Sequence, residues 1–310
     1  TINQSTNKLS LNWQTFDIGK NASVTFVQPN AQSIALNTVL SANPSQIYGK
    51  LSANGQIYLV NPNGIVVGPD ATINAAAMIL STKTLADADF LAGRYSFNQQ
   101  GPSSAAILNQ GLLQVQQNGF ITLIGQNLTN AGSIQAPGGT AGLFAGDTVA
   151  VTLSHPATSA NVIPAAAGDA RIINSGTIQA AGGAIQLIAS NSGPRGANAG
   201  APTTKPIVID QSGILDTRTT SAAPGNILID GGTTGIVQQS GVVTTANPQG
   251  VGGAITLLGD QIGLMSGSNL NGSGSTGGGT ILIGGNWQGQ GPEHNASAVY
   301  MDSAATISSN

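Results

Sequence analysis

Carboxylates are the residues of this chain most able to do acid–base chemistry, and they are few and scattered. Among the twelve acidic residues, only Asp87 and Asp89 form a tight pair, which would share one strand face if the segment is extended. Lys83 and Arg94 lie close by in the sequence, so we interpret these four residues as a solvated surface. Polysaccharide lyases and glycoside hydrolases need carboxylates that converge on one site. The spacing therefore argues against an enzyme, and a polysaccharide lyase or hydrolase is the least favoured function.

Metal and nucleophile chemistry has no better support. His155 and His294 lie in separate loop-like stretches, each isolated from other residues that ligate metals. The chain has no cysteine, which excludes disulfides, zinc–thiolate sites and thiol catalysis. No phosphate-binding loop, nucleophile elbow or dinucleotide-binding fingerprint occurs. We expect no catalytic residue, no cofactor and no metal site.

The low charge of the chain restricts its partners. Only 7% of the residues are charged and the net charge is −3, which gives no electrostatic reason to bind nucleic acid or an anionic membrane. No apolar run reaches the roughly 18 residues that a membrane-spanning helix needs. Hydrophobic residues make up 40% of the chain, which is enough to bury a sizeable core.

Short apolar runs separated by Gly, Asn, Ser and Pro indicate strands and turns throughout the chain. The segment from Asn74 to Ala88 is the one place where a helix is worth considering. Thr72, Ile73 and Thr82 argue against a helix even there, because β-branched residues favour strands. The fold class is therefore predicted to be all-β.

Three kinds of strand recur together from about residue 105, every 20 to 30 residues, which is the range of solenoid repeats. One follows a glycine-containing corner and has the pattern Ile/Leu-x-Leu/Ile, as in 121–123, 141–143, 185–187, 227–229, 255–257 and 281–283. A second has one central aliphatic residue, namely Leu113, Ile134, Ile178, Leu215, Val243 and Leu270. A third ends at a small-residue corner, as in 171–176, 208–213 and 236–241.

This repeat predicts a right-handed parallel β-helix with three strands per coil. Stacked coils would join the inward aliphatic residues into one core, while Gly and Asn occupy the corners. We expect one continuous domain, with an N-terminal β cap and first coils in residues 1–100, and further coils with loop insertions in residues 101–310. Loops are expected at 154–168, 191–206 and 286–296, and the rod is expected to be monomeric. A β-sandwich is the alternative, but it does not explain a repeated three-strand unit.

Residues 43–65 resemble a known family. Residues 43–51 read Asn-Pro-Ser-Gln-Ile-Tyr-Gly-Lys-Leu, and residues 54–65 read Asn-Gly-Gln-Ile-Tyr-Leu-Val-Asn-Pro-Asn-Gly-Ile. This stretch, with the neighbouring Asn-Trp-Gln-Thr-Phe-Asp-Ile-Gly of residues 12–19, is similar to the N-terminal secretion domain of two-partner-secretion exoproteins of the filamentous haemagglutinin type. The specific similarity covers roughly residues 6–95. The family's Asn-Pro-Asn-Leu motif is missing, which places the chain nearer the high-molecular-weight adhesins.

The resemblance implies a role in export. Such a domain is recognised in the periplasm by the POTRA domains of a TpsB-type outer-membrane transporter, emerges at the cell surface, and templates the β-helix of a longer exoprotein, commonly an adhesin. The protein is then expected to be secreted or displayed on the bacterial surface. The residues expected to serve transporter recognition or folding nucleation are Asn43, Gln46, Gly49, Asn61, Pro62, Asn63, Gly64 and Ile65.

Two alternatives remain open. Asn61-Pro62-Asn63-Gly64 has the composition of a well-formed turn, because Pro presets φ while Asn and Gly tolerate positive φ. The motif therefore either shapes that turn or contacts the transporter. The chain is alternatively itself an adhesive module that contacts a host or bacterial cell-surface receptor through the loops at 154–168 and 191–206.

Overall fold

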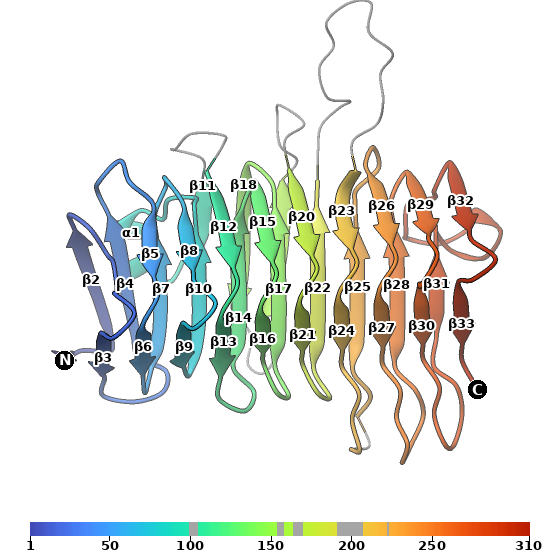
Figure 1. Ribbon diagram of the computed structural model, residues 1–310, viewed down its shortest axis with the longest axis horizontal. Helices are drawn as coiled ribbons and strands as arrows, with labels where there is room; N and C mark the ends of the chain where they lie inside the picture. Colours follow the sequence, from blue (N-terminus) through green and yellow to red (C-terminus); the bar gives the residue numbers. More distant parts are fainter. Residues whose placement is uncertain (99–104, 154–157, 164–169, 191–206, 222) are drawn as a thin grey trace, which may run out of the picture.

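The structure is a computed structural model that describes residues 1–98, 105–153, 158–163, 170–190, 207–221 and 223–310. Most of these residues form a rod of stacked coils, in which the strands of each coil pair in parallel with those of the next (Figure 1). In each coil after the first, the chain passes in turn through three sheets, which we call sheets A, B and C. The predicted parallel β-helix is confirmed, and the parallel pairing excludes the β-sandwich.

Eleven strands make up sheet A: β1 (Ile2–Asn3), β3 (Ser23–Val27), β6 (Lys50–Ala53), β9 (Thr72–Ala75), β13 (Leu112–Val115), β16 (Ser133–Gln135), β21 (Thr177–Gln179), β24 (Ile214–Asp216), β27 (Val242–Thr244), β30 (Asn269–Asn271) and β33 (Thr306–Ser308).

Sheet B has ten strands, which number coils 1 to 10: β2 (Lys8–Trp13), β4 (Ile34–Val39), β7 (Gln56–Val60), β10 (Ala77–Ser81), β14 (Phe120–Gly125), β17 (Thr140–Ala145), β22 (Ala184–Ala189), β25 (Asn226–Asp230), β28 (Ala254–Leu258) and β31 (Ile281–Ile283). Sheet C has nine: β5 (Ser45–Ile47), β8 (Ile65–Val67), β12 (Ala106–Asn109), β15 (Asn127–Asn130), β20 (Arg171–Asn174), β23 (Ile207–Gln211), β26 (Ile236–Gln239), β29 (Gln261–Leu264) and β32 (Ala298–Met301).

The inner core is built from the aliphatic residues that the repeat predicts. The central residues of the sheet A strands lie directly above one another and are fully buried: Leu113, Ile134, Ile178, Leu215, Val243 and Leu270. Each coil alone leaves these side chains open to water, and stacking joins them into a single cluster that runs along the rod. The coils begin at β1 and β2, so the first strands of the chain already belong to the rod.

Glycine is required at the corner between sheets C and A because successive coils approach too closely for a Cβ atom. A Cβ added to Gly132, Gly176, Gly213 or Gly241 would lie 2.0–2.3 Å from the carbonyl oxygen of the equivalent glycine one coil earlier. None of these glycines has a positive φ, so the close approach of the coils, and not a left-handed backbone, is the reason for them. Positive φ does occur at other corners, for example at Gly182 (φ 69°).

A buried amide ladder lies beside this corner. Asn109 Nδ2 donates to Asn130 Oδ1 (2.8 Å), Asn130 Nδ2 donates to Asn174 Oδ1 (2.7 Å), and Asn174 Nδ2 donates to Gln211 Oε1 (2.7 Å). All four side chains are fully buried. Each amide thus satisfies the next across a coil boundary, as the predicted stacking of corner Asn residues requires.

Extra elements leave the rod between a sheet B strand and a sheet C strand. These elements are α1 (Asp87–Leu91) and β11 (Ser96–Asn98), then β18 (Thr148–Leu153) and β19 (Thr158–Ile163), and the 3₁₀ turn η1 (Trp287–Gly289). Strands β11, β18 and β19 form a small antiparallel sheet. The loop expected at 286–296 is confirmed. The one expected at 154–168 contains β19, and its remainder and the loop at 191–206 lie outside the described residues.

The extra elements cover the outer face of sheet B with a second apolar cluster, which we call the outer cluster. Its sheet B members are Ile34, Leu36, Tyr58, Val60, Ala77, Ile79, Phe120, Ile124 and Phe144, and its covering members are Leu85, Phe90, Phe97, Val149 and Val151. Sheet B therefore has apolar residues on both faces in coils 2 to 6, like the strands of a doubly covered parallel sheet.

Helix α1 corrects the predictions for residues 74–88 and for the pair Asp87 and Asp89. The argument against a helix holds for β9 and β10, but Asp87 and Asp89 lie on a short helix and not on an extended strand. So short a helix depends on tertiary contacts. Lys8 Nζ donates to the carbonyl oxygens of Phe90 (2.8 Å) and Leu91 (3.0 Å), and Ser10 Oγ donates to Asp87 Oδ1 (2.7 Å). Strand β2 of the first coil thus contacts both ends of the helix. The helix dipole favours the cation of Lys8 at the C-terminal end and the anion of Asp87 at the N-terminal end.

Candidate functional site

The Asn-Pro-Asn-Gly motif forms the corner between β7 and β8 in coil 3. The Asn61 side chain is fully buried. Its Nδ2 donates to the carbonyl oxygen of Asn43 (3.0 Å) and to Ser45 Oγ (3.0 Å), and its Oδ1 accepts the backbone N–H of Asn63 (2.9 Å). The backbone N–H of Asn61 donates to the carbonyl oxygen of Ser81 (2.9 Å). This one residue therefore joins coils 2, 3 and 4.

The rest of the motif packs against the same two neighbouring coils. Asn63 Nδ2 donates to the carbonyl oxygen of Ser41 in coil 2 (2.8 Å). Gly64 has φ 124°, and a Cβ atom there would lie 3.1 Å from the carbonyl oxygen of Ala106 in coil 4. Glycine is thus needed both for the backbone angle and for the close approach.

The structure divides the predicted site residues by exposure. Gly49, Asn61, Gly64 and Ile65 are buried, Pro62 and Asn63 are half-buried, and Asn43 and Gln46 are exposed. Gly49 belongs to the corner that follows β5, where a Cβ atom would collide with the carbonyl oxygens of Gly19 and Ala22. All except Gly49 lie at or near one corner of coils 2 and 3, so the linear motif becomes one continuous patch.

A groove of about 510 Å³ lies beside this patch. Pro62 and Asn63 form part of its wall, with Leu40, Leu85 and Asp87 among the other lining residues. Leu40 is 59% exposed. The groove therefore offers a neutral to weakly acidic, partly apolar surface next to the motif, formed by coils 1 to 3 and by the first extra element.

A second turn of the same design occurs at Asn247-Pro248-Gln249-Gly250, at a corner between sheets A and B. Asn247 is fully buried, its Nδ2 donates to the carbonyl oxygen of Ser221 in coil 8 (3.0 Å), and its Oδ1 accepts the backbone N–H of Gln249 (3.1 Å). Its backbone N–H donates to the carbonyl oxygen of Ser273 in coil 10. The pattern Asn-Pro-x-Gly in the sequence would have predicted this turn, but the motif at 61–64 alone was singled out from the sequence. The turn geometry is therefore not unique to residues 61–64.

Lys83 corrects a further prediction. It is not part of a solvated surface with Asp87 and Asp89, because it is only 2% exposed. Burial lowers the pKa of Lys83 to about 8, and the charge of Asp147 opposes this shift. Asp89 and Arg94, in contrast, form an ion pair at the surface.

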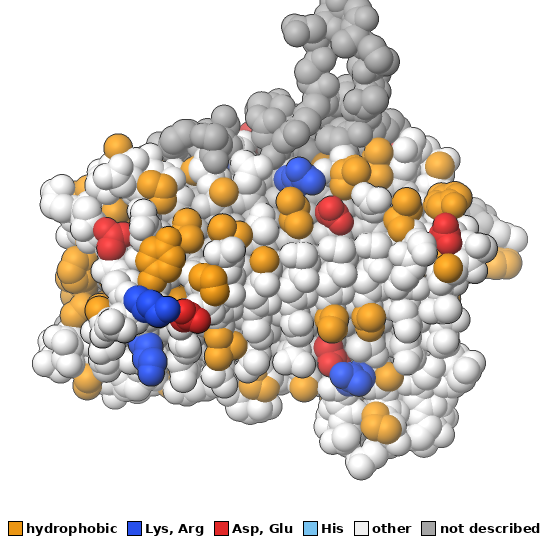
Figure 2. Space-filling view, in the orientation of Figure 1, with side chains coloured by type: hydrophobic (Ala, Val, Ile, Leu, Met, Phe, Trp, Pro, Cys, Tyr) orange, Lys and Arg blue, Asp and Glu red, His pale blue; other side chains and the backbone are white. Residues whose placement is uncertain are grey.

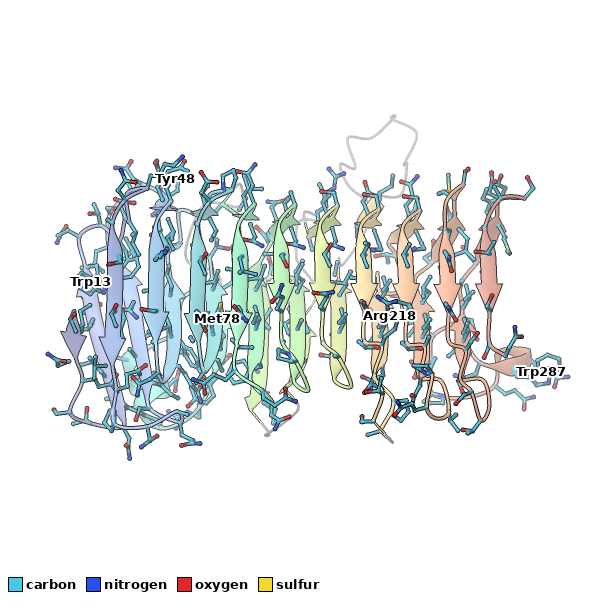
Figure 3. All side chains as sticks on the ribbon, turned by 60° about the horizontal axis from the view of Figure 1, so that its bottom comes forward. Trp13, Tyr48, Met78, Arg218 and Trp287 are labelled. Atoms are coloured by element: carbon cyan, nitrogen blue, oxygen red, sulfur yellow. The ribbon has the colours of Figure 1, made fainter. Side chains whose placement is uncertain are left out.

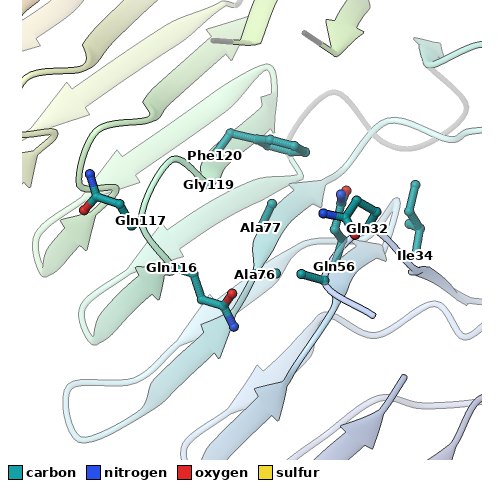
Figure 4. Close-up of a pocket in the computed structure, with 10 residues that line it drawn as sticks. Gln32, Ile34, Gln56, Ala76, Ala77, Gln116, Gln117, Gly119 and Phe120 are labelled. Carbon is teal, nitrogen blue, oxygen red and sulfur yellow. The ribbon is translucent and has the colours of Figure 1, made fainter. Parts of the chain in front are cut away.

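The remaining chemistry-bearing residues give no catalytic constellation among the described residues. His294 Nε2 lies 3.0 Å from Asp230 Oδ1, and no group of three metal-ligating side chains occurs in the ranges that the structure describes. His155 lies outside those ranges. A groove of about 450 Å³ on coils 2 to 5 is lined by Gln32, Gln56, Gln116, small residues and Phe120 (Figure 4). It has no titratable side chain, so it has no group for acid–base catalysis.

Comparisons with known proteins agree with this picture. A family model described as the TPS secretion domain matches residues 1–205. Two relatives from Haemophilus influenzae, both named heme/hemopexin-binding protein, are 40% identical over 112 residues and 36% identical over 148 residues. These alignments cover 36% and 44% of this chain but only 12% and 16% of the relatives, so the chain spans a small part of their length.

A solved structure is similar over the whole chain. The crystal structure of the HMW1 secretion domain from Haemophilus influenzae matches with a TM-score of 0.88 and 30% identity, covering 100% of this chain and 81% of that one. The similarity thus extends well beyond the region of the sequence motifs. The matched proteins are secretion domains and binding proteins by name, which supports the prediction that the chain is not an enzyme.

Proposed function

Because the chain belongs to the family of TPS secretion domains, we propose that it directs a longer exoprotein through a TpsB-type outer-membrane transporter, whose POTRA domains recognise residues 43–65. The whole exoprotein is then secreted or held at the cell surface, as an adhesin or a related binding protein. The domain has a second role in this proposal, which is to nucleate the β-helix of the exoprotein as it emerges.

The burial of Asn61 is the observation that supports this order of events. Every polar atom of its side chain is hydrogen-bonded within the rod, so a folded domain has no Asn61 group to offer a partner. Recognition of Asn61 therefore precedes folding, when the segment is extended. Asn43 and Gln46 stay exposed after folding, and Pro62 and Asn63 stay half-buried in the wall of the groove, so these four could keep contact with the transporter.

The three-coil connection of Asn61 supports the nucleation role. Its contacts reach Asn43 in coil 2 and Ser81 in coil 4, so the corner is complete only when three coils have stacked. Stacking is unfavourable until such contacts form, because the chain must first lose conformational entropy. Later coils add to a template that already exists. A residue at this corner thus affects the start of folding more than the growth of the rod.

Capture by the transporter tests the proposal directly. The POTRA domains of the cognate transporter are immobilised and exposed to the chain either freshly diluted from urea or folded beforehand. We expect the freshly diluted chain to be captured at least tenfold better, and Asn61→Ala or Asn63→Ala to reduce that capture. Asn174→Ala, in the amide ladder, is the control and should be captured like the wild type. Equal capture of the folded and unfolded chain would contradict recognition of an extended segment.

A further inference from the structure

The outer face of sheet A has a groove in the C-terminal half of the rod. Its floor is formed by β24, β27 and β30, and its wall by the long corner loops that follow these strands and project from the rod (Figure 1). The volume is about 810 Å³, within the range of small-molecule sites. No residue of the Asn-Pro-Asn-Gly corner contributes to it.

The lining is amphipathic. Ile214 and Val242 give an apolar strip on the floor, and Ile214 is 41% exposed. Amide and hydroxyl groups surround this strip, from Asn269, Asn271, Ser273 and Ser275 among others. These groups both donate and accept hydrogen bonds. A ligand that fits must therefore have one apolar face and many uncharged hydroxyl or amide groups at its edges.

No unpaired charged side chain occurs among the described lining residues of the groove, although Arg218 lies at its margin (Figure 3). The Arg218 guanidinium is bound to the carboxylate of Asp216, with Nη2 2.7 Å from Oδ2 and Nε 3.0 Å from Oδ1. Asp216 is 7% exposed, so the pair is held close to the sheet. The face of the rod in Figure 2 shows few charged side chains elsewhere. An anionic ligand would thus find no free cation in the described lining.

The wall of the groove is preorganised. Asn247 ties the three corner loops together, because it contacts Ser221 in the first loop and Ser273 in the third, and its carbonyl oxygen accepts the N–H of Ser275 (3.1 Å). The floor is a β-sheet whose strands are paired on both sides. Little conformational entropy is then lost when a ligand binds, which favours the binding of a weakly interacting ligand.

We propose that this sheet A groove binds a neutral oligosaccharide. The C–H face of a pyranose ring would pack on Ile214 and Val242, and its equatorial hydroxyls would exchange hydrogen bonds with Asn269 and Ser275. Nucleic acid is disfavoured because the only lining cation is paired, and a lipid chain is disfavoured because the wall is polar.

A glycan array with the purified 310-residue chain tests the proposal. The array holds neutral oligosaccharides of glucose, galactose and N-acetylglucosamine with two to five units, together with sialylated forms of the same glycans. We expect saturable binding to at least one neutral glycan, confirmed by titration with that glycan in solution. The double variant Asn269→Ala/Ser275→Ala should bind it at least tenfold more weakly.

The matched control uses the same sheet face outside the groove. Asn74→Ala/Ser133→Ala removes two outward polar side chains from sheet A in coils 4 and 6, outside the groove, and should bind like the wild type. Circular dichroism confirms that both variants are folded. No binding to any neutral glycan, a preference for sialylated glycans, or unchanged binding by the groove variant would each overturn the proposal. Export is not measured here, so these outcomes leave the proposed secretion role unaffected.

Discussion

Replacing Asn61 by alanine should show whether residues 61–64 serve only as a turn of the folded rod or also as a signal for export. The change removes three hydrogen bonds of a fully buried side chain, to Asn43, Ser45 and Asn63. At about 1 kcal/mol for each net hydrogen bond, the rod should lose about 2–3 kcal/mol of unfolding free energy. Asn247→Ala removes two bonds of the same kind, to Ser221 and Gln249, and should cost about 1–2 kcal/mol. Both losses are smaller than the stability of a typical domain, so both variants should fold.

Export should differ far more than stability between these two variants. The chain, preceded by a signal peptide, is produced together with its transporter in a bacterial host, and the amount outside the cells is measured by immunoblot. Urea denaturation of the purified variants gives their stabilities. We expect Asn61→Ala to reduce export at least tenfold and Asn247→Ala to reduce it less than twofold, because only the first lies in the segment proposed to meet the transporter and nucleate the rod.

Two results would refute this reasoning. If Asn61→Ala is exported at the wild-type level, residues 61–64 are only a turn. If Asn247→Ala blocks export as strongly as Asn61→Ala, the loss follows from weakened corners anywhere in the rod. A third variant, Asn63→Ala, loses one hydrogen bond, to Ser41, and should cost about 1 kcal/mol. A strong export defect in this mildly destabilised variant would support recognition over stability.

Three further predictions concern the rod itself. Since burial holds the pKa of Lys83 at about 8, against 10.5 for an exposed lysine, the unfolded chain binds more protons between these values. The unfolding free energy should therefore rise by about 1 kcal/mol between pH 8 and 9.5, allowing for screening at the ammonium group. Urea denaturation at several pH values measures this rise, and Lys83→Met should abolish it. Phe97→Ala should cost about 3–5 kcal/mol in the same assay and increase the binding of a hydrophobic dye, whereas Leu91→Ala, at a 60% exposed site, should change little. Gly176→Ala should lower the midpoint of thermal unfolding and cost about 1–3 kcal/mol of unfolding free energy or more, because its Cβ atom would meet a backbone oxygen. Gly19→Ala is the control, because Gly19 has open space around it and the change should be neutral. Equal effects of the two changes would refute the close-approach argument.

The inner core of the rod was predictable because its pattern repeats. Each coil places an aliphatic residue such as Ile134 or Leu215 at the same position, and the repeat indicates stacking without any knowledge of long-range contacts. The glycine corners were predictable in position but not in cause. The sequence shows that Gly176 recurs, and only the structure shows that a carbonyl oxygen of the previous coil excludes a side chain there.

The outer cluster could not be assembled from the sequence alone, although one signal was present. Strands β7 and β10 have continuous apolar runs, at 57–60 and 77–80, where a strand with one face in water would alternate. This pattern indicates that both faces are buried, but it does not say what covers the second face. The covering residues, such as Phe97 and Val149, lie in other segments of the chain, on the antiparallel strands β11 and β18, which do not follow the repeat.

The residues of the predicted site, Gly49 excepted, lie close together in the structure but differ in burial, and their role in transporter recognition stays a prediction. Asn61, which is buried, and Asn43, which is exposed, both precede a proline, and only the glycine of the Asn-Pro-x-Gly pattern distinguishes the buried residue. Their burial is decided by which coil stacks on each corner. The similarity between the turns at 61–64 and 247–250 likewise appears only when hydrogen bonds to neighbouring coils are compared.

The three corners of the coil differ in how freely their length can change during evolution. The passage from sheet C to sheet A takes two residues in five successive coils, from Gln110-Gly111 to Ser240-Gly241, and its glycines leave no room for a side chain. The passage from sheet B to sheet C instead varies from a few residues to whole antiparallel strands. Insertions and deletions among homologous exoproteins should therefore accumulate at the corner between sheets B and C. The same corner is where a foreign peptide epitope could be grafted for display on a bacterial surface without shifting the register of any coil.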